Sequence, residues 1–128
     1  MIIKDKGRKD AGFLQLSNYI WNGALEDSEE ELPPFIIRHN VEGFTPEAVA
    51  EEFKERYNNR RYRGKNANAM HHLMLSWHPD DNEQLTDDMA EDMAYTFLEN
   101  YASDALGYGT IHRNKEHVHV HLMVSNTT

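Results

Sequence analysis

The sequence contains no cysteine, and this absence excludes two classes of site. Disulfide bonds and thiolate-bound zinc both require cysteine, so neither can stabilise the fold. The absence is compatible with a reducing compartment, and we expect a bacterial cytoplasmic location. The N-terminus also lacks the pattern of a signal peptide, and no apolar run approaches about 18 residues. We therefore expect no membrane span and no membrane partner.

Basic residues are scarce: 13 Lys and Arg stand against 22 Asp and Glu, for a formal net charge of −9. Taken alone, this balance argues against a nucleic-acid partner. The positive charge is nevertheless gathered in residues 4–9 and 56–65. The second segment interleaves basic residues with Tyr and Asn, a composition that can contact phosphates and stack on bases. The candidate DNA-binding residues there are Arg56, Arg60, Arg61, Arg63 and Lys65. The alternative, which the residues alone favour, is a solvated loop.

The 128 residues have an ordinary globular composition and suffice for one domain, which we take as residues 1–128. The polar residues 1–10 are expected to be frayed. Helices are predicted over residues 11–22, from Thr45 and from Thr86, where Thr-Pro-Glu and Thr-Asp-Asp are helix starts. Gly23 is expected to end the first helix. Strands are predicted over residues 35–39, 71–77, 108–113 and 116–125. This order predicts an α+β domain with an antiparallel or mixed central sheet flanked by helices.

Apolar residues recur at helical spacing in the last predicted helix and alternate in the last predicted strand. In the helix, every fourth residue is large and apolar beside a row of smaller ones: Met89, Met93, Phe97 and Tyr101 beside Ala90, Ala94 and Leu98. This pattern predicts one apolar face. The two final strands are separated by residues 114–116, a connection short enough for a hairpin.

Histidines are concentrated near the C-terminus, at His112 and then at His117, His119 and His121. Alternate side chains of a strand share a face, so the last three lie together, opposite Val118, Val120, Leu122 and Val124. A hairpin would place His112 beside them. Imidazole is the commonest metal ligand, and three could converge on one divalent ion with open positions left, as a catalytic site requires. We take the ligands to be His112, His119 and His121.

The other histidines leave alternatives open. His117 would support a ligand or face the substrate, and a histidine-rich solvent face is the alternative for the whole cluster. His72, on the strand over residues 71–77, either neighbours the site or is a satisfied core residue. His39 and His78 are expected to be structural. On affinity, histidine ligands favour Mn²⁺, Ni²⁺, Co²⁺ or Zn²⁺.

These segments together resemble the relaxases, the mobilization nucleases of conjugative plasmids and transposons, to which the T-DNA border nickase is related. The C-terminal segments that carry the resemblance are His72-Leu-Met-Leu-Ser-Trp-His-Pro-Asp-Asp, Leu85-Thr, Gly107-Tyr-Gly-Thr-Ile-His and His117-Val-His-Val-His-Leu-Met-Val. Upstream, Leu16-Ser-Asn-Tyr-Ile is similar to the tyrosine motif of the family, and Phe35-Ile-Ile-Arg-His-Asn-Val and Ala50-Glu-Glu-Phe also agree.

The resemblance implies a His-hydrophobic-His nuclease fold and a divalent-metal site at His112, His119 and His121, which works in the family with Mg²⁺ or Mn²⁺. It implies that Tyr19 attacks one strand of DNA at an origin of transfer. We take His72 as a second catalytic residue. The product would carry a 5′-phosphotyrosine link and a free 3′-hydroxyl. Single-stranded DNA and accessory mobilization proteins are the expected partners.

Two departures from the family pattern bear on this expectation. Asn114 stands where the family usually has Asp two residues after the first histidine, so it would support a ligand or face the substrate. Relaxase domains usually continue beyond the end of this sequence, so we expect either a truncated domain or a minimal relative. The alternatives are a replication-initiator or transposase-type nuclease of the same superfamily, and a non-catalytic metal-binding DNA-interaction domain.

Overall fold

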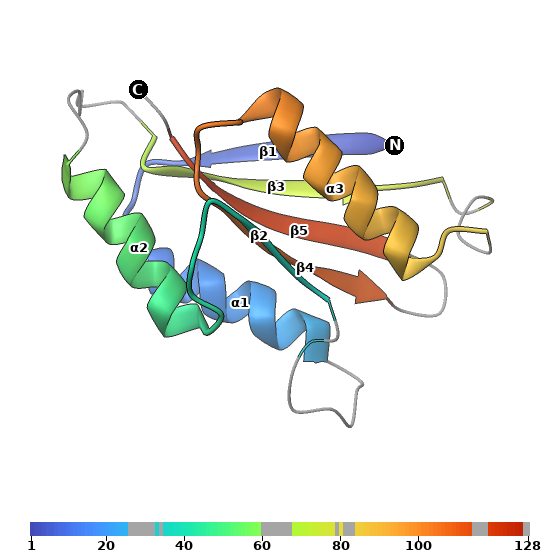
Figure 1. Ribbon diagram of the computed structural model, residues 1–128, viewed down its shortest axis with the longest axis horizontal. Helices are drawn as coiled ribbons and strands as arrows, with labels where there is room; N and C mark the ends of the chain where they lie inside the picture. Colours follow the sequence, from blue (N-terminus) through green and yellow to red (C-terminus); the bar gives the residue numbers. More distant parts are fainter. Residues whose placement is uncertain are drawn as a thin grey trace.

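The computed structural model describes residues 1–25, 33, 35–59, 68–78, 80, 84–113 and 118–126. In these ranges five strands and three helices alternate before a final strand pair (Figure 1). In chain order they are β1 (Ile2–Arg8), α1 (Phe13–Leu25), β2 (Ile36–His39), α2 (Pro46–Asn59), β3 (Met70–Ser76), α3 (Asp87–Tyr101), β4 (Gly107–Arg113) and β5 (Val118–Ser125). Among the described helices, none is long and apolar enough to cross a membrane.

The five strands form one sheet in the order β1-β3-β5-β4-β2, and every neighbouring pair is antiparallel. This arrangement confirms the predicted α+β class, with the antiparallel rather than the mixed form of sheet. β5 lies at the centre, and β4 pairs with it in the register His112 opposite His119. The predicted pairing of the last two strands is therefore present, while residues 114–116 lie outside the described residues.

Helices cover both faces of the sheet, with α3 on one face and α1 and α2 on the other (Figure 1). Alternation along β5 divides its side chains between the two cores. Val118, Val120, Leu122 and Val124 pack with the α3 side, whereas Met123 packs with α1 and α2. The predicted apolar face of β5 is thus confirmed, and the histidines of β5 are left on the α1 face.

Both predicted helix starts are confirmed by their capping hydrogen bonds. The Thr45 hydroxyl accepts from the Ala48 N–H at 3.2 Å, and the Thr86 hydroxyl accepts from the Met89 N–H at 3.1 Å. The buried face of α3 is narrower than its apolar pattern suggested. Its fully buried residues are the small stripe and Leu98, whereas Met89 and Tyr101 are about half exposed. Small residues allow α3 to approach the sheet closely.

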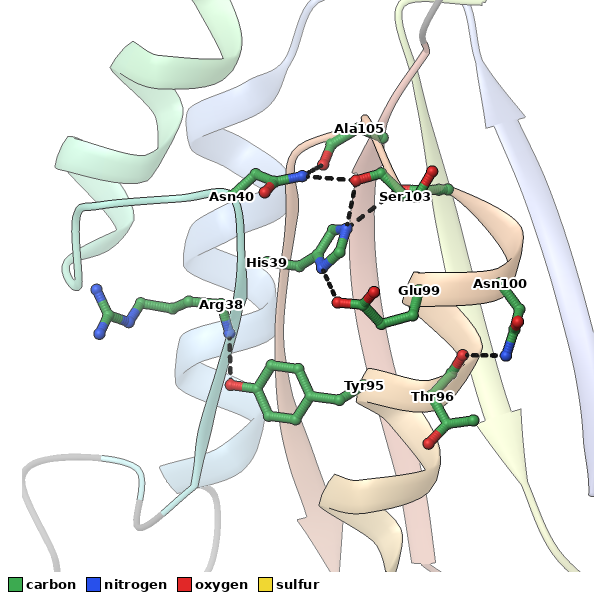
Figure 2. Close-up of polar contacts among 10 residues, drawn as sticks. Arg38, His39, Asn40, Tyr95, Thr96, Glu99, Asn100, Ser103 and Ala105 are labelled. Atoms are coloured by element: carbon green, nitrogen blue, oxygen red, sulfur yellow. Dashed lines mark hydrogen bonds and ion pairs between the residues drawn. The ribbon is translucent and has the colours of Figure 1, made fainter.

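The end of β2 is joined to the end of α3 by His39, which is buried (Figure 2). Its Nε2 lies 3.2 Å from the Ala102 carbonyl oxygen and 3.1 Å from that of Ser103. The next residue, Asn40, has φ 60°, a conformation that Asn tolerates, and its amide donates to the carbonyls of Ser103 and Ala105 at 2.9 Å. These contacts engage the carbonyls of the turn that follows α3 and so join it to the end of β2. His39 therefore has the structural role that was expected.

Two expectations for the N-terminal part were wrong. Residues 1–10 were expected to be frayed, but residues 2–8 form β1, which pairs with β3 along its whole length. β1 is an edge strand with mostly exposed side chains, so its sequence carries no alternation of apolar and polar residues. Backbone hydrogen bonds to β3 hold it instead. In addition, α1 does not end at Gly23 but continues to Leu25.

Candidate active site

Tyr19 lies on α1, and its side chain is on the exposed side of the helix. The neighbouring Leu16 and Ile20 are buried against the sheet and α2, while the Tyr19 side chain is 55% exposed. Its ring meets two imidazoles edge-on, with ring centroids 5.8 Å from His72 and 5.9 Å from His121. α1 therefore places an accessible phenol beside histidines from β3 and β5.

The histidines on this face gather around His121. The ring centroid of His121 lies 4.1 Å from that of His112, 5.3 Å from His72 and 6.3 Å from His119. His121 Nδ1 is also 3.1 Å from His72 Nε2, within hydrogen-bond distance. His72 thus lies within this cluster, which decides between the two alternatives that its position in the sequence left open. The cluster draws on β3, β4 and β5.

Burial keeps the central imidazoles neutral. Desolvation lowers the pKa of His121 to about 3, and the neighbouring His112, His72 and His119 act in the same direction. Burial also lowers the pKa of His72, with further contributions from the charges of Arg8 and Lys6. Neutral imidazole retains a lone pair on one ring nitrogen, so these residues can bind a metal ion at neutral pH.

α1 is fixed to β4 next to Tyr19. The Ile20 carbonyl accepts from the Thr110 hydroxyl at 2.8 Å and from His112 Nε2 at 3.0 Å. Gly23, one turn along the helix, faces the same ring, since a Cβ there would lie 2.9 Å from both His112 ring nitrogens. The absence of a side chain at Gly23 is what lets α1 lie this close. Gly23 therefore permits close packing of α1 on His112, and it lacks the positive φ with which a glycine commonly ends a helix.

A shallow cavity of about 420 Å³ opens beside Tyr19 and is lined by Tyr19, Asn22, Gly23 and Leu25. Its lining combines one aromatic ring, one amide and apolar surface. Such a lining suits a flat group that also carries hydrogen-bonding edges. The cavity belongs to the same end of α1 as the contact with His112.

The histidine cluster fits a divalent metal by its chemistry. Its donors are imidazoles on one face, and burial disfavours the protonated forms of His121 and His72. In the ranges that the structure describes, no three His, Cys, Asp or Glu side chains are arranged as ligands of one ion. At present His112 Nε2 is directed at the Ile20 carbonyl and His121 Nδ1 at His72. Rotation of these side chains would be needed to direct three nitrogens at one point.

Most of the predicted DNA-binding and supporting residues are not placed by the structure. Arg60, Arg61, Arg63, Lys65, Asn114 and His117 lie outside the described residues. Arg56 is described: it is half-buried on α2, and its guanidinium donates to the Asp104 carbonyl. This contact links α2 to the turn after α3, so Arg56 contributes to the fold.

Sequence reasoning missed three features of this face. Thr110 and Gly23 position α1, and Lys6 of β1 stands opposite His72 in the strand register. Thr110 could have been found, because it lies two residues before His112 and therefore on the same face of β4. The basic residues of β1 alternate in the sequence, but the segment was expected to be frayed. The role of Gly23 depends on its contact with His112, which lies far away in the sequence, and no local pattern reveals such a contact.

Comparisons with known proteins give a family and a similar fold. A family model described as "Relaxase: MobA/VirD2-like, nuclease domain" matches residues 19–128. Among curated proteins, none matches the chain. One solved structure, the MobM relaxase domain (MOBV; Mob_Pre) bound to a 26-nucleotide pMV158 oriT DNA, has a similar fold, with a TM-score of 0.56. That similarity covers 96% of this chain and 67% of the other at 19% sequence identity, so it concerns the fold alone.

Proposed function

The chain belongs to the MobA/VirD2-like relaxases through their nuclease domain, and from this premise we propose that it nicks one strand of DNA at a specific site and becomes joined to it through Tyr19. The observation that carries the proposal is the position of Tyr19, an exposed phenol whose ring lies against those of His72 and His121. A nucleophile beside neutral bases is the arrangement that covalent catalysis requires.

In the proposed reaction, the Tyr19 oxygen attacks the phosphorus of the scissile phosphodiester. A bond forms between that oxygen and phosphorus, and the bond from phosphorus to the 3′ oxygen breaks. A phenol has a pKa of about 10 and must lose its proton to attack well. We assign His72 to take that proton, because it is neutral and adjacent, and a proton passes to the departing 3′ oxygen. The 5′-phosphotyrosine product retains the phosphodiester energy, so the strand can be rejoined.

The proposal assigns a divalent ion to His112, His119 and His121, with Mg²⁺ or Mn²⁺ as the candidates that the family suggests and Zn²⁺, Ni²⁺ or Co²⁺ as ions that imidazole also binds. When bound, such an ion would polarise the scissile phosphate and neutralise charge that develops on its oxygens. The residues themselves fix the geometry. His112 and Thr110 hold the carbonyl of Ile20, and the next residue back is Tyr19.

We infer that the substrate is single-stranded DNA at an origin of transfer. The similar MobM domain was solved with oriT DNA, which supports this inference. The cavity beside Tyr19 would receive a base next to the scissile phosphate, with the Asn22 amide available to its edge. Accessory mobilization proteins would deliver the melted strand, and His117 and Asn114 would support the ligands or face the substrate.

The test is replacement of Tyr19 by Phe, which removes the nucleophile and leaves the ring. The wild-type protein, incubated with Mn²⁺ and a labelled pool of random single-stranded oligonucleotides, should give a covalent band on a denaturing gel. The Tyr19→Phe protein should give none, at unchanged thermal stability and Mn²⁺ affinity. Tyr101→Phe is the matched control, because Tyr101 is similarly exposed but lies on α3, across the sheet.

Three outcomes would contradict the proposal in different ways. An adduct that persists in the Tyr19→Phe protein would show that another residue is the nucleophile. Tight Mn²⁺ binding with no adduct from any single strand would favour the non-catalytic alternative. Cleavage of hairpin ends alone would instead point to the transposase-type branch.

A further inference from the structure

The basic side chains of β1 lie on the same face of the sheet as the candidate active site. In the antiparallel register, Lys6 stands opposite His72, Lys4 opposite Met74 and Arg8 opposite Met70. Directly paired residues share a face, so all three basic residues flank the strand that carries His72. β1 is the edge strand, with no further described strand beyond it. The basic row therefore borders the open side of the site.

The intervening residues fix this orientation. Asp5 points to the opposite face, where its carboxylate lies 2.9 Å from His71 Nδ1 and accepts from the Tyr101 hydroxyl at 3.3 Å. His71 is the neighbour of His72 on β3, and Tyr101 is the last residue of α3. A slip of one residue would break both contacts and turn the lysines away from the site. The backbone pairing of β1 with β3 holds this register, and the contacts of Asp5 on the far face agree with it.

Lys4 and Lys6 are available for a ligand. Both are exposed, and neither makes a hydrogen bond or ion pair with any residue that the structure describes. Arg8 differs, because its guanidinium donates to Asp10 at 3.2 Å and lies 3.5 Å from the Gln15 amide oxygen. The chain as a whole has a net charge of −9, so two lysines beside the site, without an acidic partner among the described residues, give this region a positive charge opposite in sign to that of the chain.

We propose that Lys4 and Lys6 bind successive backbone phosphates of the single strand whose scissile phosphate lies at Tyr19. This inference rests on the proposed function, which it extends from the reacting bond to the path of the strand. Side chains two apart on a strand are about 6.8 Å from each other, a separation comparable with that of neighbouring phosphates in an extended nucleotide chain. Lysine contacts to phosphate add affinity without sequence preference, so the strip would hold the strand in register while other contacts read the bases.

The test measures the salt dependence of DNA binding in the full chain. Fluorescence anisotropy with labelled oligothymidylate should show that the Lys4→Gln/Lys6→Gln protein binds more weakly. The slope of log affinity against log salt should fall by about 1.4, since each phosphate contact on a single strand contributes about 0.7. Lys54→Gln is the matched control, because Lys54 is exposed on α2 among Glu51, Glu52 and Glu55, where DNA would be repelled. Its slope should equal that of the wild type.

The same samples separate this inference from the proposed function. An unchanged slope in the double variant would overturn the phosphate strip, as would a wild-type protein that does not bind oligothymidylate. A lysine-dependent slope without any Tyr19 adduct would support the strip and contradict the nickase. A Tyr19 adduct together with a salt slope that does not depend on the lysines would support the nickase and contradict the phosphate strip. Gln keeps the apolar stem at exposed positions, and equal thermal unfolding of the variants would show that β1 remains in place.

Discussion

At the scale of single residues, Gly23 determines how closely α1 can approach the histidine cluster. Its backbone lies against the His112 ring, and the same ring donates to the Ile20 carbonyl. Glycine within a helix costs stability relative to alanine, by about 1 kcal/mol. Its presence inside α1 is therefore explained by the space that His112 needs rather than by any benefit to the helix.

Replacement of Gly23 by Ala should separate helix stability from site geometry. A methyl group there would meet the ring of His112, so the ring must move away from the Ile20 carbonyl. We expect Mn²⁺ affinity, measured by isothermal titration calorimetry, and the rate of adduct formation both to fall by about tenfold or more. A raised melting temperature with unchanged Mn²⁺ affinity would show that Gly23 has no role in the site.

Residue patterns predicted which histidines share a face, because alternation along a strand is a local property. They did not predict that Tyr19 meets His72 and His121, since that contact joins α1 to strands far away in the sequence. Tyr19 was identified only through the resemblance to relaxases. The same limit applies to Gly23, whose contact with His112 spans most of the chain.

At the scale of elements, the site depends on how α1 is held on β4 and β5. The Thr110 hydroxyl donates to the Ile20 carbonyl from a fully buried position, and β4 places Thr110 beside His121 in the register. Thr110 touches none of the reacting atoms, so it acts as a positioning residue. It fixes the helix residue adjacent to Tyr19.

Replacement of Thr110 by Val keeps the volume of the side chain and removes the hydroxyl. We expect a loss of about 1–3 kcal/mol in the free energy of unfolding, because a buried hydrogen bond is lost. Adduct formation should slow by more than DNA affinity weakens, and Thr110→Ser should restore the rate. An equal loss of rate in the Ser and Val variants would indicate a packing defect rather than a positioning role.

Replacement of His39 by Ala tests the join between β2 and α3 (Figure 2). The variant removes the ring that contacts the carbonyls of Ala102 and Ser103, and it leaves a buried gap. We expect the free energy of unfolding to fall by about 2 kcal/mol in a denaturant titration, with the adduct rate unchanged at low temperature. His78→Ala is the control, because His78 is exposed, and it should change stability by less than about 0.5 kcal/mol. Equal effects of the two substitutions would contradict a structural role for His39.

The three helices and the strands β2 to β5 could be predicted, because helix caps and apolar periodicity depend on residues that are close together in the sequence. Thr45 and Thr86 began helices as expected, and the alternation in β5 identified its buried face. β1 could not be predicted in this way. It buries little of its own surface and exists through pairing with β3, a property of the partner strand rather than of residues 2–8.

At the scale of the whole molecule, an acidic chain has to bring together enough positive charge to hold DNA. In the proposed account the α1 face supplies this charge, because the lysines of β1 border the histidines and Tyr19 there. A row of carboxylates lies apart from them along α2, on the same side of the sheet. Charge is therefore gathered in local clusters of one sign, a feature that net charge alone conceals. This distribution accounts for why composition argued against a nucleic-acid partner.

The central claim is that Tyr19 is the residue that becomes joined to DNA, and the identity of the linked residue tests it most directly. The adduct formed with Mn²⁺ and single-stranded DNA would be digested with protease and nuclease, and its peptide mapped by mass spectrometry. The chain has six tyrosines, so the assignment is discriminating. The account predicts a nucleotide attached through its 5′ phosphate to the peptide that contains Tyr19. Attachment to any other residue would contradict it.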